Sequence, residues 1–139
     1  MKTLTKEKLT KLFNYFQNGN YEYVIRECRT LLKKFPHHLA LYNLLGLSFQ
    51  QINNLKDAKE HYLKALQFNS NNVSVLNNLG SLCRVLEEYE NSEKYLIKAL
   101  NLQPEYVHAL SNYGNLKKEL NDFDGAIELY KKALKLNDN

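Results

Sequence analysis

The chain has 139 residues, of which 44% are hydrophobic, and it carries 19 basic and 15 acidic side chains, a formal net charge of +4. That length and hydrophobic content suit one domain, residues 1–139, with a continuous core, and no second domain fits. The mild, evenly scattered positive charge argues against nucleic acid as a partner, and no stretch reaches the roughly 18 apolar residues that insertion across a membrane needs.

The cellular setting follows from the N-terminal residues and the cysteines. Residues 1–7 lack the apolar core of a secretion signal, so we expect a cytoplasmic protein, or the cytoplasmic piece of a larger one. Cys28 and Cys83 stand where the pattern described below places packing residues. We expect both to be buried, reduced thiols, since a structural cysteine behaves as a small hydrophobic residue.

The first two predicted helix pairs cover residues 5–38 and 39–72. In the first pair, Leu9, Leu12, Phe13 and Phe16 make an apolar stripe at helical spacing. The turn at 18–20 places a glycine where positive φ is needed and Asn20 where it can cap a second helix over about 21–34. In the second pair, the inner turn at 53–57 begins with two asparagines, which suit the left-handed position and the cap.

The last two predicted pairs cover residues 73–106 and 107–139. The inner turn of the third pair has Glu87 and Glu88 in place of glycine and asparagine. Glutamate tolerates positive φ poorly, so we expect a looser or differently shaped turn there. The final helix, 123–136, carries Ile127, Tyr130 and Leu134, which would dock on a next unit, so we expect part of that face to be open to solvent or to a partner.

One spacing relates these pairs. Gly46, Gly80 and Gly114 are 34 residues apart, and Ala65, Ala99 and Ala133 keep the same interval, each followed by a leucine. A fixed period of this length indicates a solenoid built from one repeated supersecondary unit.

The repeated residues resemble the tetratricopeptide repeat, whose pattern is W-x2-L-G-x2-Y, then A-x3-F, then P. The Leu-Gly pair is held by residues 45–46, 79–80 and 113–114, and the alanine and aromatic slots of the second helix by Ala58 and Tyr62, Ser92 and Leu96, and Ala126 and Tyr130. The resemblance implies an all-α, right-handed superhelical solenoid of antiparallel helix pairs. The resemblance also implies four repeats, at about 5–38, 39–72, 73–106 and 107–139.

No catalytic or metal-binding motif accompanies the repeats. The sequence has no phosphate-binding glycine loop, no H-E-x-x-H, no G-x-S-x-G and no paired C-x-x-C. Adjacent His37 and His38 lie in a turn, where they rarely converge on one ion. We therefore expect no enzymatic activity, no cofactor and no metal.

The resemblance also implies a concave groove, lined by the first helices of successive repeats, that binds extended peptides. Helical spacing from the tryptophan slot selects the residues that would face it. The predicted groove residues are Phe13, Asn43, Leu44, Leu47, Asn77, Asn78, Ser81, Arg84, His108, Ser111, Asn112, Asn115 and Lys118.

The asparagines are the most informative of these residues. Asn78 and Asn112 precede the Leu-Gly position, where the repeats of O-linked N-acetylglucosamine transferases carry an asparagine ladder that holds peptide backbone. An amide offers both a donor and an acceptor, so a row of amides can grip a main chain. The alternative to a ladder is that these asparagines have no binding role and only reflect the abundance of asparagine in this chain. The carboxylate clamp of chaperone-binding repeats is absent, because its positions lack the required cations.

The groove residues predict an extended ligand with an apolar anchor at one end and polar or acidic residues at the other, since leucines and phenylalanine stand in the early repeats and Arg84, His108 and Lys118 in the late ones. The leading interpretation is a non-enzymatic scaffold that binds a protein or peptide partner. One alternative is a substrate-targeting region of a larger enzyme, such as a glycosyltransferase. Another is self-assembly into a homo-oligomer through Ile127, Tyr130 and Leu134.

Overall fold

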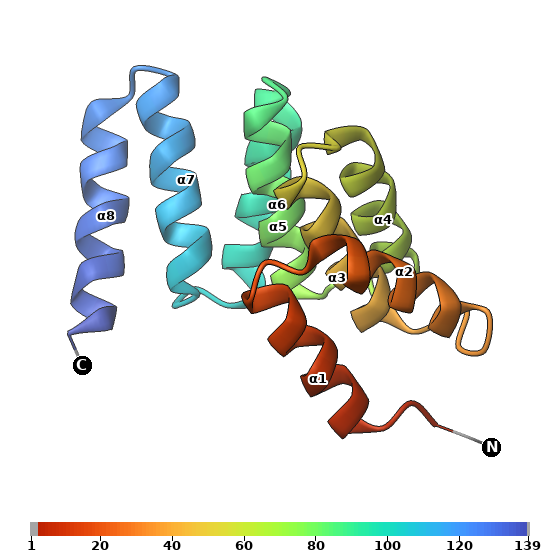
Figure 1. Ribbon diagram of the computed structural model, residues 1–139. Helices are drawn as coiled ribbons and strands as arrows, with labels where there is room; N and C mark the ends of the chain where they lie inside the picture. Colours follow the sequence, from red (N-terminus) through yellow and green to blue (C-terminus); the bar gives the residue numbers. More distant parts are fainter. Residues whose placement is uncertain (1–2, 139) are drawn as a thin grey trace. The chain divides into compact units, whose positions relative to one another are not determined.

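The computed structural model describes residues 3–138, and over that range the chain consists of α-helices joined by short turns, with no strand (Figure 1). The helices form two compact units, Met1–Ser70 and Asn71–Asn139. The division lies at the predicted border between the second and third repeats. The all-α class built from helix pairs is confirmed.

The first unit contains two helix pairs. Its core is made of side chains with no exposed surface, among them Val24, Cys28, Leu41, Leu45 and Tyr62. Asn54 caps the fourth helix as predicted, because its Oδ1 accepts a hydrogen bond from the Asp57 amide at 3.3 Å. Asn20 occupies the N-cap position of the second helix as predicted, but its side chain makes no capping hydrogen bond. The helices are α1 (Lys6–Gln17), α2 (Tyr21–Leu32), α3 (Leu39–Gln51) and α4 (Leu55–Phe68).

The second unit repeats this arrangement. Asn72 begins its first helix and accepts a hydrogen bond from the Val75 amide at 3.0 Å. The helices are α5 (Val73–Val85), α6 (Tyr89–Leu102), α7 (Val107–Glu119) and α8 (Phe123–Asn137). Within the unit, α5 packs on α6 and on α7, α6 packs on α7, and α7 on α8. Fully buried leucines fill the spaces between them, including Leu76, Leu79, Leu82, Leu96 and Leu116.

The four inner turns have one geometry. Each places one residue in the left-handed region, namely Gly19 at φ 80°, Asn53 at 61°, Glu87 at 59° and Asn121 at 62°. In each turn the next amide donates to the carbonyl five residues earlier, over 2.8 to 3.0 Å, which closes a Schellman motif. The expected looser turn at Glu87 was therefore wrong. The hydrogen bonds of the motif hold this glutamate in a conformation that its side chain disfavours.

The repeated glycines of the first helices lie against large side chains of the second helices. A Cβ atom on Gly46 would stand 2.4 Å from the Tyr62 ring, and one on Gly114 would stand 2.6 Å from the Tyr130 ring. On Gly80 it would stand 2.7 Å from Cγ of Leu96. Close approach of the two helices explains the 34-residue glycine spacing. Among the described helices, none combines the length and apolar character needed to cross a membrane.

Candidate functional site

The predicted groove residues of the second unit come from two helices in contact with each other. Asn77, Asn78, Ser81 and Arg84 belong to α5, and Ser111, Asn112, Asn115 and Lys118 belong to α7. Within each helix the last three of these residues follow each other at intervals of three and the first is their immediate neighbour, so they share one side of it. We call this surface the α5/α7 face.

An amide pair joins the two helices of this face. Nδ2 of Asn112 donates a hydrogen bond to Oδ1 of Asn77 over 2.8 Å. Asn77 is only 5% exposed, so its amide is part of the contact between repeats. Of the two predicted ladder residues, Asn112 is thus already engaged in this pair, and Asn78 lies half-buried beside Asn77 in sequence.

An ion pair joins the same helices. Nη1 of Arg84 donates to Oε1 of Glu119, and the two side chains are 20% and 33% exposed. Nε of Arg84 is buried and has no hydrogen-bond partner among the described residues. The predicted groove cation is therefore neutralised by a carboxylate from the neighbouring repeat, whereas Lys118 is exposed to solvent.

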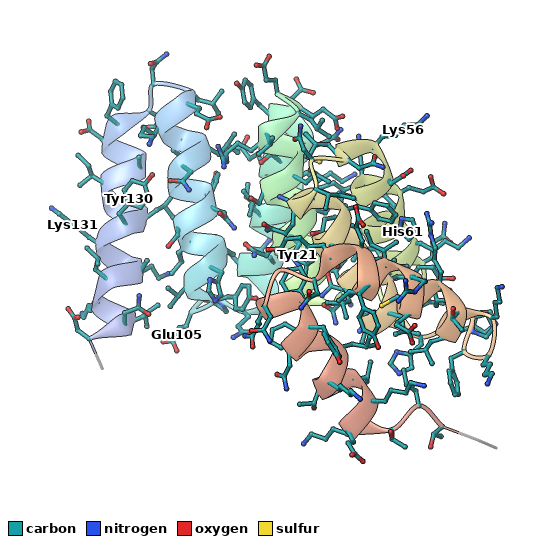
Figure 2. All side chains as sticks on the ribbon, viewed as in Figure 1. Tyr21, Lys56, His61, Glu105, Tyr130 and Lys131 are labelled. Atoms are coloured by element: carbon teal, nitrogen blue, oxygen red, sulfur yellow. The ribbon has the colours of Figure 1, made fainter. Side chains whose placement is uncertain are left out.

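Asn115 is tied to the last helix. The Tyr130 hydroxyl donates a hydrogen bond to its Oδ1 over 2.6 Å. Figure 2 shows the Tyr130 side chain directed from α8 toward α7, while Lys131 points away. Ser111 is half-buried, and the exposed His108 lies at the beginning of α7 with its ring edge-on to Tyr106 at 5.6 Å.

The remaining predicted groove residues lie in the first unit. Phe13 on α1 is 46% exposed, with its ring 6.1 Å from that of Phe16. Asn43 and Leu47 on α3 are half-buried. Leu44 is 6% exposed and belongs to the core, so it has little surface to offer a ligand.

Sequence reasoning missed a polar cluster between α6 and α7. The Tyr113 hydroxyl donates to Oε1 of Glu93 over 2.8 Å, and Nζ of Lys117 donates to the same oxygen over 3.2 Å. The Tyr113 hydrogen bond, followed by the Lys117 contact, holds the pKa of Glu93 below its usual value, and the hydrogen bond that Lys117 donates to Glu93 raises the pKa of Lys117. Burial, and then Glu93, raises the pKa of Tyr113. The sequence carried one signal for this cluster, because Lys117 stands where the repeat pattern has tyrosine.

The structure changes the set of residues that make up the predicted self-association face. Ile127 and Leu134 are 49% and 62% exposed, as an open face requires. Tyr130 does not belong to that face, because its ring packs on Gly114. Phe123, at 58% exposure and four residues before Ile127, joins it instead.

Comparison with protein families gives two matches. Sequence profiles described as Tetratricopeptide repeat match residues 39–72 and 72–139. Together they cover the second to fourth predicted repeats, and residues 5–38 lie outside both matches. No curated protein matches the chain.

Comparison with solved structures gives the same fold. The PilF protein of Pseudomonas aeruginosa is 31% identical, with a TM-score of 0.86 over 94% of this chain and 60% of the PilF chain. Two crystal structures of MamA are 21% and 23% identical, with TM-scores of 0.78 and 0.77, over 97% and 96% of this chain and 76% and 75% of theirs. The present chain thus spans less than two thirds of PilF, and the MamA similarity concerns the fold alone.

Proposed function

Since the chain belongs to the tetratricopeptide repeat family, a family of protein–protein interaction scaffolds, we propose that it holds an extended segment of a partner protein against the α5/α7 face. The observation that carries this proposal is the concentration of amide and hydroxyl groups on two helices in contact. The scaffold acts by binding alone and catalyses no reaction.

The chemistry of the face selects a ligand main chain. Asn78, Ser81 and Ser111 are half-buried polar side chains that offer both donors and acceptors. A peptide backbone presents the matching alternation of N–H and C=O groups. Binding of this kind depends little on the side chains of the ligand.

The charge of the face favours a polar segment over a strongly acidic one. Arg84 is paired with Glu119, so it adds no net charge. Lys118 is exposed and supplies one cation near the end of α7. The sequence predicted a ligand with an acidic end. With only this one exposed cation on the face, we expect that end to carry a single carboxylate.

The proposed setting is the cytoplasm. Both cysteines, Cys28 and Cys83, are free thiols and both are buried. Reduced thiols of this kind are usual in the cytoplasm, where disulfides are rare.

A peptide-display selection on the whole chain tests the proposal. We expect an enriched peptide, titrated by fluorescence anisotropy, to bind Asn78→Ala/Asn112→Ala about tenfold or more weakly, since each lost amide bond costs about 1 kcal/mol. Asn101→Ala, which changes an exposed asparagine of α6, is the matched control and keeps full affinity.

The variants need a check on folding because Asn112 also bonds Asn77. Thermal unfolding followed by circular dichroism shows whether the double variant keeps its helices. A second variant, Asn78→Ala alone, leaves that amide pair intact. Unchanged peptide affinity in both variants would exclude the α5/α7 face as the site.

A second candidate function is self-assembly through α8. Phe123, Ile127 and Leu134 lie on one side of this helix and are about half exposed or more. The corresponding helix of the preceding repeat, α6, has such a side covered by α7. A second copy of the chain could cover the α8 face in the same way.

Light scattering after size exclusion tests self-assembly. We expect oligomers at high protein concentration and monomers for Ile127→Lys/Leu134→Lys, because two buried charges would oppose the contact. Lys132→Glu, an exposed residue five positions after Ile127 and therefore on another side of the same helix, is the control. A strict monomer at high concentration in the unmodified chain would exclude this function.

A further inference from the structure

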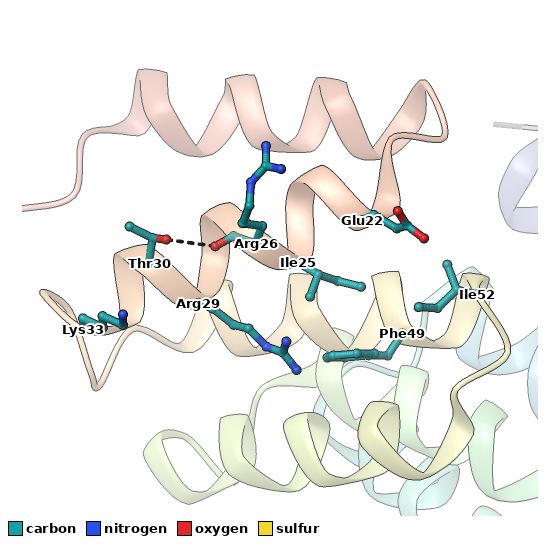
Figure 3. A pocket seen from close by; sticks show the side chains of 8 residues that line it. All are labelled: Glu22, Ile25, Arg26, Arg29, Thr30, Lys33, Phe49 and Ile52. Atoms are coloured by element: carbon teal, nitrogen blue, oxygen red, sulfur yellow. Dashed lines mark hydrogen bonds between the residues drawn. The ribbon is translucent and has the colours of Figure 1, made fainter.

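A pocket of about 400 Å³ lies on the first unit, and none of the predicted groove residues lines it. Figure 3 shows it between α2 and the end of α3. The α2 residues recur at intervals of three or four, so they form one stripe along that helix. The pocket, called here the α2 pocket, is lined by Glu22, Ile25, Arg26, Arg29, Thr30 and Lys33 together with Phe49 and Ile52.

The floor of the α2 pocket is apolar. Ile25 and Phe49 are 7% and 4% exposed, so they present only one edge to the pocket. Ile52, at the end of α3, is 42% exposed and closes the floor on the side of Glu22. An aliphatic or aromatic side chain placed here would cover apolar surface that is now in water.

The charges of the α2 pocket are separated along the helix. Glu22 stands at its beginning, and Arg29 and Lys33 stand two to three turns later, roughly 10 to 16 Å along the axis. Arg29 lies over the Phe49 ring, with Cζ 5.3 Å from the ring centroid. Its stacked guanidinium is positioned by this contact and keeps its N–H groups for an anion.

The two cations at this end have no carboxylate partner. Among the described residues, neither Arg29 nor Lys33 forms an ion pair, and Arg26 reaches only Glu27, with Nε 3.9 Å from Oε1. The Thr30 hydroxyl donates to the Arg26 carbonyl over 3.1 Å, so it is used within the helix. The pocket therefore offers an apolar floor beside two positive charges, on Arg29 and Lys33, that no carboxylate among the described residues neutralises.

We propose that the α2 pocket binds a segment of a partner protein in which an apolar side chain is followed by acidic side chains. The apolar side chain covers Ile25, Phe49 and Ile52, and the carboxylates pair with Arg29 and Lys33. Carboxylate pairs with arginine are charge-assisted and frequently bidentate, which fixes the direction of the segment. A basic residue before the apolar one matches Glu22.

The composition of the pocket favours protein over nucleic acid. A phosphate backbone carries a uniform negative charge, which Glu22 would repel at one end of the stripe. The apolar floor gives nothing to a phosphate chain, whereas it suits leucine or phenylalanine. A short protein segment can supply both an apolar side chain for the floor and charged side chains for the charges of the pocket.

The test uses the full chain and a fluorescent synthetic peptide with lysine, leucine and three glutamates in that order. A matched peptide has glutamines in place of the glutamates. We expect the first peptide to bind about tenfold or more tightly than the second at roughly 0.02 M salt, with the difference shrinking near 0.5 M. Methyl resonances of Ile25 and Ile52 shift on binding.

Charge reversal in the protein locates the site. Arg29→Glu/Lys33→Glu is expected to abolish the preference for glutamate and to bind a lysine-substituted peptide instead, whereas Lys34→Glu, an exposed neighbour outside the pocket, changes nothing. Arg29→Gln guards against a folding defect, because it removes the charge without reversing it. Equal binding of the two peptides, an unaffected double variant, or displacement of the peptide by an oligothymidylate would each overturn the proposal.

Discussion

The Tyr62 ring on α4 occupies the space in front of Gly46 on α3, so that a Cβ atom at residue 46 would lie 2.4 Å from Cε1 of the ring. Tyr62 has no exposed surface, and its hydroxyl donates to Oε1 of Gln50 over 2.9 Å. The Tyr62 ring is therefore held by its packing on Gly46 and by the hydrogen bond of its hydroxyl to Gln50. Gly114 and Tyr130 repeat this contact in the second unit.

Gly46→Ala should destabilise the protein. Overpacking against a fixed ring costs about 1–3 kcal/mol, which exceeds the gain of up to about 1 kcal/mol from placing alanine in a helix. We expect the free energy of unfolding, measured in urea, to fall by about 1 kcal/mol or more.

Two controls belong to the Gly46 experiment. The three atoms nearest to a Cβ on residue 125 all belong to the side chain of the exposed Asp122, which can move aside at the loss of the capping bond that it accepts from the Gly125 amide, so Gly125→Ala should cost no more than about 1 kcal/mol. In a Tyr62→Ala background, Gly46→Ala should cost less than in the unmodified chain. An equal cost in both backgrounds would show that the ring is not the cause.

Replacing Glu87 by asparagine should stabilise the protein. Glu87 has φ 59°, in the left-handed region that costs a side chain about 1–2 kcal/mol and that asparagine tolerates better. We expect a gain of about 0.5–1 kcal/mol in urea unfolding. The reciprocal change, Asn53→Glu, places glutamate in the matching turn and should lose a similar amount. A loss of stability in Glu87→Asn would contradict this account.

Removing the Glu93 carboxylate should alter the response to acid. The folded state lowers the pKa of Glu93 below its ordinary value of 4.5, chiefly through the Tyr113 hydrogen bond. The folded state then binds fewer protons than the unfolded one, so the contribution of Glu93 is complete above pH 4.5 and is lost as the pH falls through the lowered value.

Urea unfolding of the unmodified chain and of Glu93→Gln, at several pH values from about 6 down to 3, measures this contribution. We expect the stability difference between them to shrink as the pH falls through this range. Glu90→Gln, on the same helix, controls for the loss of one carboxylate. A difference that stays constant with pH would show that the Tyr113 and Lys117 contacts do not favour the ionised form.

Cys28 should resist alkylation in the folded protein. Burial, with a smaller contribution from Glu27, raises the pKa of its thiol from 9.0 to about 12, and the thiolate is the reactive form. We expect slow modification by iodoacetamide at pH 8 and fast modification in urea, followed by intact mass. The substitution Ser70→Cys, at an exposed position, gives the reference rate. Equal rates at Cys28 and at this introduced thiol would refute the burial argument.

The repeat pattern predicted most of the fold because its residues satisfy local geometry. Gly46, Gly80 and Gly114 and the inner-turn residues recur every 34 positions, and the structure places each set in one role. Glu87 is the informative exception. Its own preference predicted another turn, but the hydrogen bonds that close the motif are made by backbone, and they determine the conformation whatever side chain is present.

The side-chain pairs of the candidate site could not be predicted in the same way. Helical spacing placed Asn112 and Arg84 on the proper side of each helix, but it gives no distance between helices. Only the packing of α5 on α7 brings Asn112 to Asn77 and Arg84 to Glu119. Whether a peptide binds there stays a prediction.

The sequence by itself determined the helix pairs, their turns and the family, since these depend on residues close together in one repeat. Only the tertiary structure decided which polar groups are engaged, which charges are neutralised and which apolar side chains are exposed. The Glu93 cluster, the inward Tyr130 and the α2 pocket all depend on contacts between helices. Those contacts arise from packing of residues distant in the chain, and no local preference specifies them.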